Sequence, residues 1–225
     1  MAAAATPPFS APPLSPPPPT SPRQYDSSRR RAAALTNRRA ILDACRELLF
    51  RDGYQATTIR AVADQAGLSP ETVYKAFGNK PRMMKALWDI TLAGDDSTLT
   101  IAERPEIQAI AATADPHAKL VKYAAFVSGV QERLAALFTL LAQSDPEVAQ
   151  LLDATEQERL IGVTAFVAHL AHEGMLRTGA DQGIVADACW VLTSPHLFIQ
   201  LTAARRWEVD TYRHWLTDVL TATLL

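Results

Sequence analysis

Apolar residues recur at spacings of three and four along most of this chain, which is the spacing of one helix face. A first helix is predicted over residues 36–52 and ends at Gly53. Its apolar stripe consists of Ile41, Ala44, Cys45, Leu48 and Leu49. No stretch shows the sustained period-two alternation of a half-buried strand. The pattern therefore predicts an all-α protein.

Two short helices follow, over residues 58–66 and 70–77, and a turn at Gly67 separates them. Thr57 stands where it can cap the first short helix. The apolar stripe of this helix consists of Ile59, Val62 and Ala63. Gly67 is the residue best able to adopt the positive φ that a tight turn between short helices requires, and Leu68 is free to enter the core. This order predicts a helix-turn-helix.

Three residues mark the start of the second short helix. Ser69 can cap it, Pro70 suits the first helical position, and Glu71 lies where the helix dipole favours a carboxylate. Val73 and Phe77, four residues apart, are expected to anchor the helix in the core. The opposite face carries hydroxyl, phenol and ammonium groups on Thr72, Tyr74 and Lys75. Such a face suits contact with nucleic acid.

The rest of the chain is divided by Gly94 and by prolines placed as the first residues of helices. A fourth helix is predicted over residues 79–93, with Asn79 as its cap, and it supplies packing that a three-helix domain lacks. Further helices are predicted over residues 105–112, 116–142, 146–173, 182–193, 195–205 and 209–224. We expect a helix-turn-helix domain over residues 29–78 and a larger helical domain over residues 79–225.

The N-terminal segment over residues 1–28 is expected to be a disordered tail. Residues 1–22 are uncharged and carry nine of the fifteen prolines, so they cannot form a packed core. Such a tail is a solvated extension, a site for a proline-recognising partner, or the product of a misassigned start codon. Arg29, Arg30 and Arg31 come next. They form either a basic arm that reaches into a DNA groove or a charged helix start that faces solvent.

Charge is distributed unevenly between the two halves. From Arg23 to Lys85 there are 13 Lys and Arg residues against 6 Asp and Glu residues, whereas residues 86–225 hold 9 against 18. A basic N-terminal part is typical of a phosphate-binding module, and an acidic remainder is better suited to protein or ligand contacts. The alternative is a chance spread of solvated charge.

Other classes of protein find little support. No apolar run approaches the ~18 residues of a membrane helix and no secretory signal is visible, so we expect a cytoplasmic protein with no membrane partner. Cys45 and Cys189 lie in helical patterns and are expected to be buried, reduced thiols. His169 and His172 have a spacing that can share a metal, but no third ligand is identifiable. We expect no metal, no cofactor and no catalytic residue.

The motif resembles the N-terminal domain of the tetracycline-repressor (TetR) family of bacterial transcription regulators. Family members read G-[YF]-x-x-T-T-[VI]-R-x-[IV]-A, then A-G-[VL]-S, then [LV]-Y-x-x-F-x-x-K. The matching residues are Gly53, Tyr54, Thr57, Thr58, Ile59, Arg60, Val62, Ala63, Ala66, Gly67, Leu68, Ser69, Val73, Tyr74, Phe77 and Lys80. Glu71 and Ala76 depart from the pattern. The likeness is strong over residues 36–90 and is only architectural beyond them.

The resemblance implies a set of DNA contacts. Thr57, Thr58 and Lys80 are expected to contact phosphates, and Tyr74 resembles the family tyrosine that hydrogen-bonds the DNA backbone. The side chains expected to meet base edges are those of Pro70, Glu71, Thr72 and Lys75. Arg60 is either a further contact or part of an ion pair within the domain.

The resemblance also implies a small-molecule effector, apolar or aromatic, inside the helical C-terminal domain, and assembly as a homodimer. The expected effector-binding residues are Trp88, Phe126, Phe138, Phe166, His169 and Trp190, although a plain packed core explains such residues equally well. Apolar residues of the last helices are expected either to form a two-fold interface or to close the monomer's own core. The implied function is a ligand-responsive repressor on a pseudo-palindromic operator. The alternatives are a protein–protein adaptor that uses the tail, or an all-helical enzyme with a silent motif.

Overall fold

The structure is a computed structural model that describes residues 27–95, 97, 99–142 and 146–225. No strand occurs in these ranges, which confirms the all-α prediction. In chain order the elements are α1 (Ser27–Ala56), α2 (Ile59–Ala66), α3 (Pro70–Phe77), α4 (Lys80–Ala93), the 3₁₀ turn η1 (Ile101–Glu103), α5 (Pro105–Ala111), α6 (Pro116–Ala142), α7 (Pro146–His172), α8 (Gln182–Leu192), α9 (Pro195–Ile199), the π-helical turn η2 (Gln200–Ala204) and α10 (Val209–Leu224). Each helix predicted from residue 58 onward is present with nearly the same bounds.

The first helix is longer than its apolar stripe predicts. It begins at Ser27 instead of residue 36, so Arg29, Arg30 and Arg31 are its first turns and do not form a separate arm. Alanine and arginine are strong helix formers, which explains why the polar segment before the apolar stripe is helical. Gly53 breaks the helix as expected, with φ 81° and ψ 174°. The remainder of the expected tail, residues 1–26, lies outside the described residues.

The cap of α2 is one residue later than predicted. Thr58 is the N-cap, and its hydroxyl accepts a hydrogen bond from Ala61 N at 3.1 Å. Thr57 is fully buried, and its Oγ1 donates to the Gly53 carbonyl at 2.8 Å. Gly67 closes the helix in the left-handed region with φ 66°. Ser69 caps α3 as predicted by accepting from Thr72 N.

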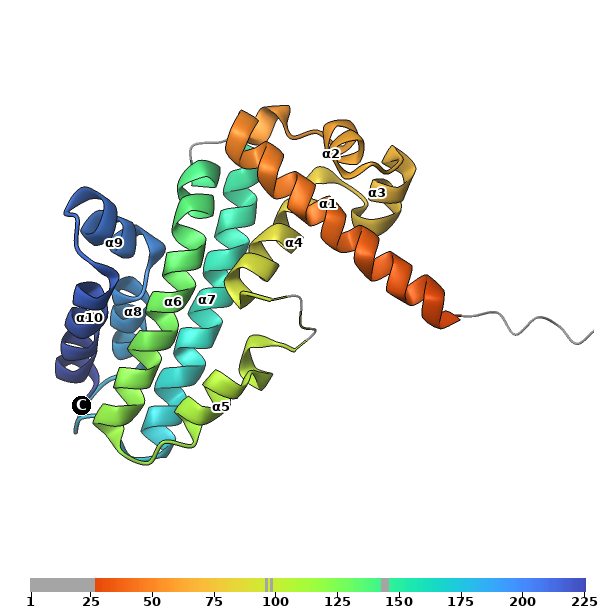
Figure 1. The fold of residues 1–225 in the computed structure, drawn as a ribbon. Coiled ribbons are helices and arrows are strands. Elements are labelled where there is room, and N and C mark those ends of the chain that lie inside the picture. Colours follow the sequence, from red (N-terminus) through yellow and green to blue (C-terminus); the bar gives the residue numbers. More distant parts are fainter. Residues whose placement is uncertain (1–26, 96, 98, 143–145) are drawn as a thin grey trace, which may run out of the picture.

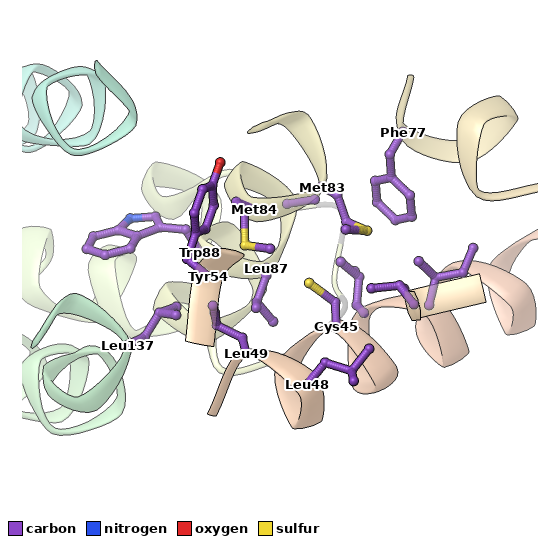
Figure 2. Close-up of a cluster of buried hydrophobic side chains, with 14 of the residues drawn as sticks. Cys45, Leu48, Leu49, Tyr54, Phe77, Met83, Met84, Leu87, Trp88 and Leu137 are labelled. Carbon is purple, nitrogen blue, oxygen red and sulfur yellow. The ribbon is translucent and has the colours of Figure 1, made fainter. Parts of the chain in front are cut away.

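The core beneath the helix-turn-helix continues into the larger domain. Met83, Met84 and Leu87 of α4 pack against α1 and α3, and Leu137 of α6 borders the same cluster (Figure 2). Buried residues from α1 to α4 and from α6 and α7 form one contiguous group. The three N-terminal helices are therefore stabilised by packing on α4, as the sequence suggested.

The long helices α6 and α7 form the centre of the larger domain, with α8 and α10 on one side and α5 on the opposite side, near the end of α6 and α7 that is remote from α1 (Figure 1). A second buried cluster joins α6, α7, α8 and α10 around Tyr212. Cys45 and Cys189 are both buried free thiols, as expected, and burial raises the pKa of each to about 12.

The expectation that nothing approaches a membrane span needs correction. Residues 116–142 and 182–204 are long and apolar enough to cross a membrane by length and composition alone. In this fold their apolar side chains, such as Leu120 of α6 and Val185 of α8, pack in the second core cluster. A core helix of this length passes the same test of length and composition, because its apolar face is buried in the protein.

The turn at Gly67 offers a test of the motif's backbone. A Cβ at this position meets no atom within 4 Å, so any cost of substitution comes from the positive φ and not from crowding. Gly67→Val is expected to lower the free energy of unfolding by ~1–2 kcal/mol, because a β-branched residue is strained in this region. Gly67→Asn is the matched control with a smaller expected loss, and urea unfolding measures both. Equal losses for the two variants would contradict a conformational origin.

Candidate nucleic-acid interface and ligand cavity

The outer face of α3 is exposed at the end of the molecule remote from α8 and α10 (Figure 1). Val73 and Phe77 are buried as predicted, and the side chain of Tyr74 is 55% exposed. Of the residues assigned to base edges, Glu71 and Lys75 are exposed, and Pro70 and Thr72 are half-buried. These four residues and Tyr74 therefore share one accessible ridge.

Glu71 is held at the N-terminus of α3. Hydrogen bonds from its own backbone N–H and from the Ser69 hydroxyl lower the pKa of its carboxyl group. The ridge thus carries an ionised carboxylate near its start and the Lys75 ammonium in its last turn. A carboxylate accepts a hydrogen bond from a cytosine amino group but repels phosphate. The α3 ridge is therefore better suited to contacts with base edges than to nonspecific attraction of the DNA backbone.

Two of the predicted phosphate contacts are placed differently. Thr57 cannot reach a phosphate, because it is fully buried and its hydroxyl is bonded to Gly53. Of the two threonines at the N-terminus of α2, Thr58 is the one that is exposed and can contact a phosphate. The error arose because adjacent threonines are equivalent by type, and only the helix phase decides which one faces the core.

Lys80 is also turned inward. Its Nζ donates to the Tyr54 carbonyl at 2.6 Å and lies 3.6 Å from the centroid of the Tyr54 ring. The structure therefore shows Lys80 fastening the chain after α1 to the start of α4, instead of presenting a point charge to solvent. Arg60 is exposed on α2, and within the described residues it forms no salt bridge.

Arg38, which the sequence assigned with Arg39 to the basic arm or to a solvent-facing helix start, contacts α3. Its guanidinium carbon lies 4.7 Å from the centroid of the Phe77 ring, at the end of α3. A second link joins Gln65 of α2 to Glu47 of α1 at 2.9 Å. These contacts set the orientation of α2 and α3 against α1. The arginine run gave a charge signal, but nothing in it indicated that Arg38 would meet α3.

A large cavity lies between α4, η1, α5, α6 and α7, with a volume of about 1470 Å³. The first turns of the apolar part of α1 reach its rim through Leu35 and Arg38. Its predominantly apolar lining includes Trp88, Ile107, Phe126, Val127, Leu134 and Phe166. A space of this kind fits a sizeable apolar molecule.

Four of the six predicted effector residues line this cavity, namely Trp88, Phe126, Phe166 and His169. Phe138 does not, because it packs in the core between Trp88, at 6.4 Å between ring centroids, and His196, at 4.7 Å. Trp190 also lies outside, beneath Arg159, whose guanidinium carbon is 4.9 Å from its ring. The aromatic type alone could not separate lining from core, as both need apolar surface.

One wall of the cavity is polar, and the sequence did not point to it. The Arg159 guanidinium donates hydrogen bonds to Glu156 Oε2 at 2.5 Å and to the Trp190 carbonyl at 2.7 Å. Gln131 is 3% exposed and donates to the Thr193 carbonyl, while its Oε1 has no hydrogen-bond partner. The Trp88 Nε1 is likewise buried without a partner. Buried polar atoms are normally satisfied, so among the described residues these two atoms are exceptions, and both belong to residues that line the cavity.

The C-terminus of α4 is held by two arginines from the larger domain. Arg133 of α6 donates to the Thr91 and Leu92 carbonyls at 3.2 and 2.8 Å. Arg104 donates to the Ala93 carbonyl and forms a bidentate pair with Asp95. This hydrogen bonding lowers the pKa of Asp95 to about 2, so the carboxylate is ionised at neutral pH. Cations at a helix C-terminus also complement the helix dipole.

Comparison with known proteins identifies the N-terminal domain. Residues 41–87 match the model of bacterial regulatory proteins, tetR family. A segment of 52 residues, 23% of the chain, is 44% identical to the uncharacterized HTH-type transcriptional regulator YvkB of Bacillus subtilis (strain 168). That match spans 27% of the relative, about a quarter of its length.

Solved structures share the fold over most of the chain. FadR from Bacillus subtilis, in complex with stearoyl-CoA, is 20% identical with a TM-score of 0.62, over 83% of this chain and 99% of that one. A TetR transcription regulator from Haloarcula marismortui is 19% identical with a TM-score of 0.60, over 85% and 100%. SmeT in complex with triclosan is 19% identical with a TM-score of 0.62, over 84% and 92%.

The fold and the exposed α3 ridge define a helix-turn-helix DNA-binding protein with a second, helical, cavity-bearing part. Residues 41–87 form a DNA-binding domain of the TetR type, so the resemblance seen in the sequence is confirmed for this domain, and the solved structures show that the rest of the chain shares the fold.

The inward position of Lys80 leads to a stability prediction. Lys80→Met removes the bond to the Tyr54 carbonyl and the contact with its ring, so the free energy of unfolding is expected to fall by ~1–2 kcal/mol. Lys75→Met is the matched control, because Lys75 is exposed, and its effect is expected within about 0.5 kcal/mol. Urea unfolding gives both values. A Lys80 variant as stable as the control would show that the inward contact contributes nothing.

Proposed function

We propose that this protein is a homodimeric, ligand-responsive repressor that binds a pseudo-palindromic operator and acts in the cytoplasm. The observation that carries the proposal is that α4 belongs to two sites at once. Its buried face packs against α1 and α3, and Ala86, Trp88, Ile90 and Leu92 line the cavity. A molecule in the cavity therefore touches the helix that positions the DNA-binding ridge.

On DNA, α3 enters the major groove and α2 rests its N-terminus on the backbone. Lys75 donates to guanine, and Pro70, Glu71 and Thr72 meet neighbouring base edges. Tyr74 and Thr58 contact phosphates, with Thr58 taking the place assigned to Thr57 by sequence. The mainly basic segment from Arg23 to Lys85 supplies nonspecific attraction to the duplex.

The effector is a small molecule with a largely apolar body. The cavity's predominantly apolar and partly aromatic lining supports this assignment. FadR of Bacillus subtilis and SmeT, which share this fold, form complexes with stearoyl-CoA and triclosan. Binding displaces α4 relative to α6, and a coupling of ~1–3 kcal/mol is enough to vacate an operator.

The homodimer is proposed to form through α8 and α10. Part of the apolar surface assigned to this interface closes the monomer's own core, because Phe198, Leu216 and Leu220 are buried. Ile184 and Val191 of α8, seven residues apart on one face, remain 69% and 55% exposed. Exposed apolar side chains that share a helix face are suited to a partner surface. A two-fold pair of α3 helices then matches half-sites about one DNA turn, ~34 Å, apart.

The roles on α3 are tested by fragments selected from random DNA, followed by binding to the selected duplex and its single-base variants at several salt concentrations. Lys75→Ala is expected to relax preference at one base position, at a cost of ~1–3 kcal/mol on the selected site. Tyr74→Phe is expected to weaken all duplexes alike. Wild-type affinity should fall steeply with salt. Absence of duplex binding at low salt would reject the regulator and favour an adaptor or enzyme.

The proposed interface is tested by sedimentation of Ile184→Asp, alone and combined with Val191→Asp. A carboxylate on each side of a two-fold contact is expected to convert the dimer to monomer and to weaken operator binding at least tenfold. Val121→Asp is the control, because Val121 is 42% exposed but lies on α6. A monomeric wild-type protein, or an unchanged dimer in the double variant, would rule out this interface.

A further inference from the structure

A buried cation lies behind the cavity wall at its α5 end. Lys119 of α6 is 0% exposed, and its Nζ donates to the Ala111 carbonyl at 3.1 Å and lies 2.7 Å from His169 Nε2. Ala111 and His169 both line the cavity, so Lys119 lies directly behind the wall that they form. Within the described residues no carboxylate forms a salt bridge with Lys119.

A buried ammonium with neutral partners is incompletely compensated. Removing an ammonium from water costs several kcal/mol, and carbonyl and imidazole dipoles return less than a full opposite charge does. Arg159, a cation of the cavity lining, differs in this respect, because it is already matched by Glu156. The site around Lys119 therefore has a local excess of positive charge beside an apolar space.

The lysine also fixes the tautomer of the histidine. With Lys119 as an ammonium, which is a donor only, His169 Nε2 is the acceptor and the ring proton is assigned to Nδ1. Nδ1 makes no hydrogen bond within the ranges that the structure describes. His169 is thus a donor on the cavity wall, with a cation bound to its opposite nitrogen, and this arrangement favours an anionic acceptor over a neutral one.

We propose that the effector carries a carboxylate, hydrogen-bonded by His169 and stabilised by Lys119, with its apolar body lying along α6 toward Gln131. Gln131 follows Lys119 by twelve residues, about 18 Å along a helix, which sets the length of the apolar body. This inference rests on the proposed effector cavity and specifies the chemical class of its ligand.

The test uses phenylnaphthylamine, an uncharged fluorescent probe of apolar cavities, with decanoate and decanol as competitors of equal chain length. In the wild-type protein, decanoate is expected to displace the probe at a concentration ~10-fold lower than decanol, although decanol is the more apolar molecule. Lys119→Met is expected to abolish this preference while leaving the affinity for the probe within about twofold. His169→Phe, which keeps a ring without its nitrogens, is expected to do the same.

Lys122→Met is the matched control. Lys122 is exposed on the same helix, donates to Thr113 Oγ1 and is not part of the cavity lining, so the preference for decanoate should persist. Equal displacement by the two competitors in the wild-type protein would overturn this inference alone. A preference that survives both Lys119→Met and His169→Phe would also overturn it, because the anion would then sit elsewhere. Failure of the wild-type protein to bind the probe, or of both competitors to displace it, would overturn the effector cavity itself.

Discussion

The position of the DNA-binding ridge depends on how α4 is held at both ends. At its start, Lys80 bonds the Tyr54 carbonyl, and Met83, Met84 and Leu87 fill the core beneath α1 and α3. At its end, Arg133 and Arg104 bind the last carbonyls. The N-terminal helices have no separate core, because the buried cluster that contains them continues into α6 and α7. Any movement of α4 is therefore transmitted to α3 as a whole, since packed interiors shift as rigid units more readily than they deform.

The cavity acts on the middle of this same helix. Trp88 belongs both to the core and to the cavity wall. Its ring faces Phe138 in the core, and the same residue lines the cavity. Among the described residues, its Nε1 has no hydrogen-bond partner. Lys85 adds a further link, because its ammonium lies 3.0 Å from Glu158 on the cavity-lining helix α7. This pair is partly exposed, so it contributes little to stability and can be exchanged at small cost. A ligand that separates α4 from α7 would therefore have to break only weak polar contacts. Arg104 and Arg133 hold the last carbonyls of α4, so α4 would turn about this end.

The helix bounds could be read from the sequence because their signals are local. Ser69 and Asn79 cap the helices that follow them, and Pro116 begins a helix as its place predicted. The predictions that differ from the structure concern which side chains face the core, the solvent or the cavity. Thr57 and Thr58 differ only in helix phase, and the inward bond of Lys80 depends on a partner 26 positions away. Phe138 and Phe166 are the same residue type in similar helical patterns. Packing against distant elements decides which of them reaches the cavity. The pairing of Lys119 with His169 spans 50 positions and left no trace in the local pattern.

The charge of the α3 ridge depends on which nearby cations are bound to other parts of the protein. Because Lys80 is committed to Tyr54 and Arg38 to the Phe77 ring, Lys75 is the cation that α3 itself presents, and Glu71 offsets its charge. A ridge with little net charge attracts phosphate weakly, so nonspecific affinity must come mainly from the basic turns at the start of α1 and from the N-terminus of α2. Attraction and base reading are then carried by different helices. Under the proposed function, a shift of α4 that tilts α3 by a small angle would abolish base contacts while general attraction to DNA persists, so the protein would leave its operator and stay on the chromosome.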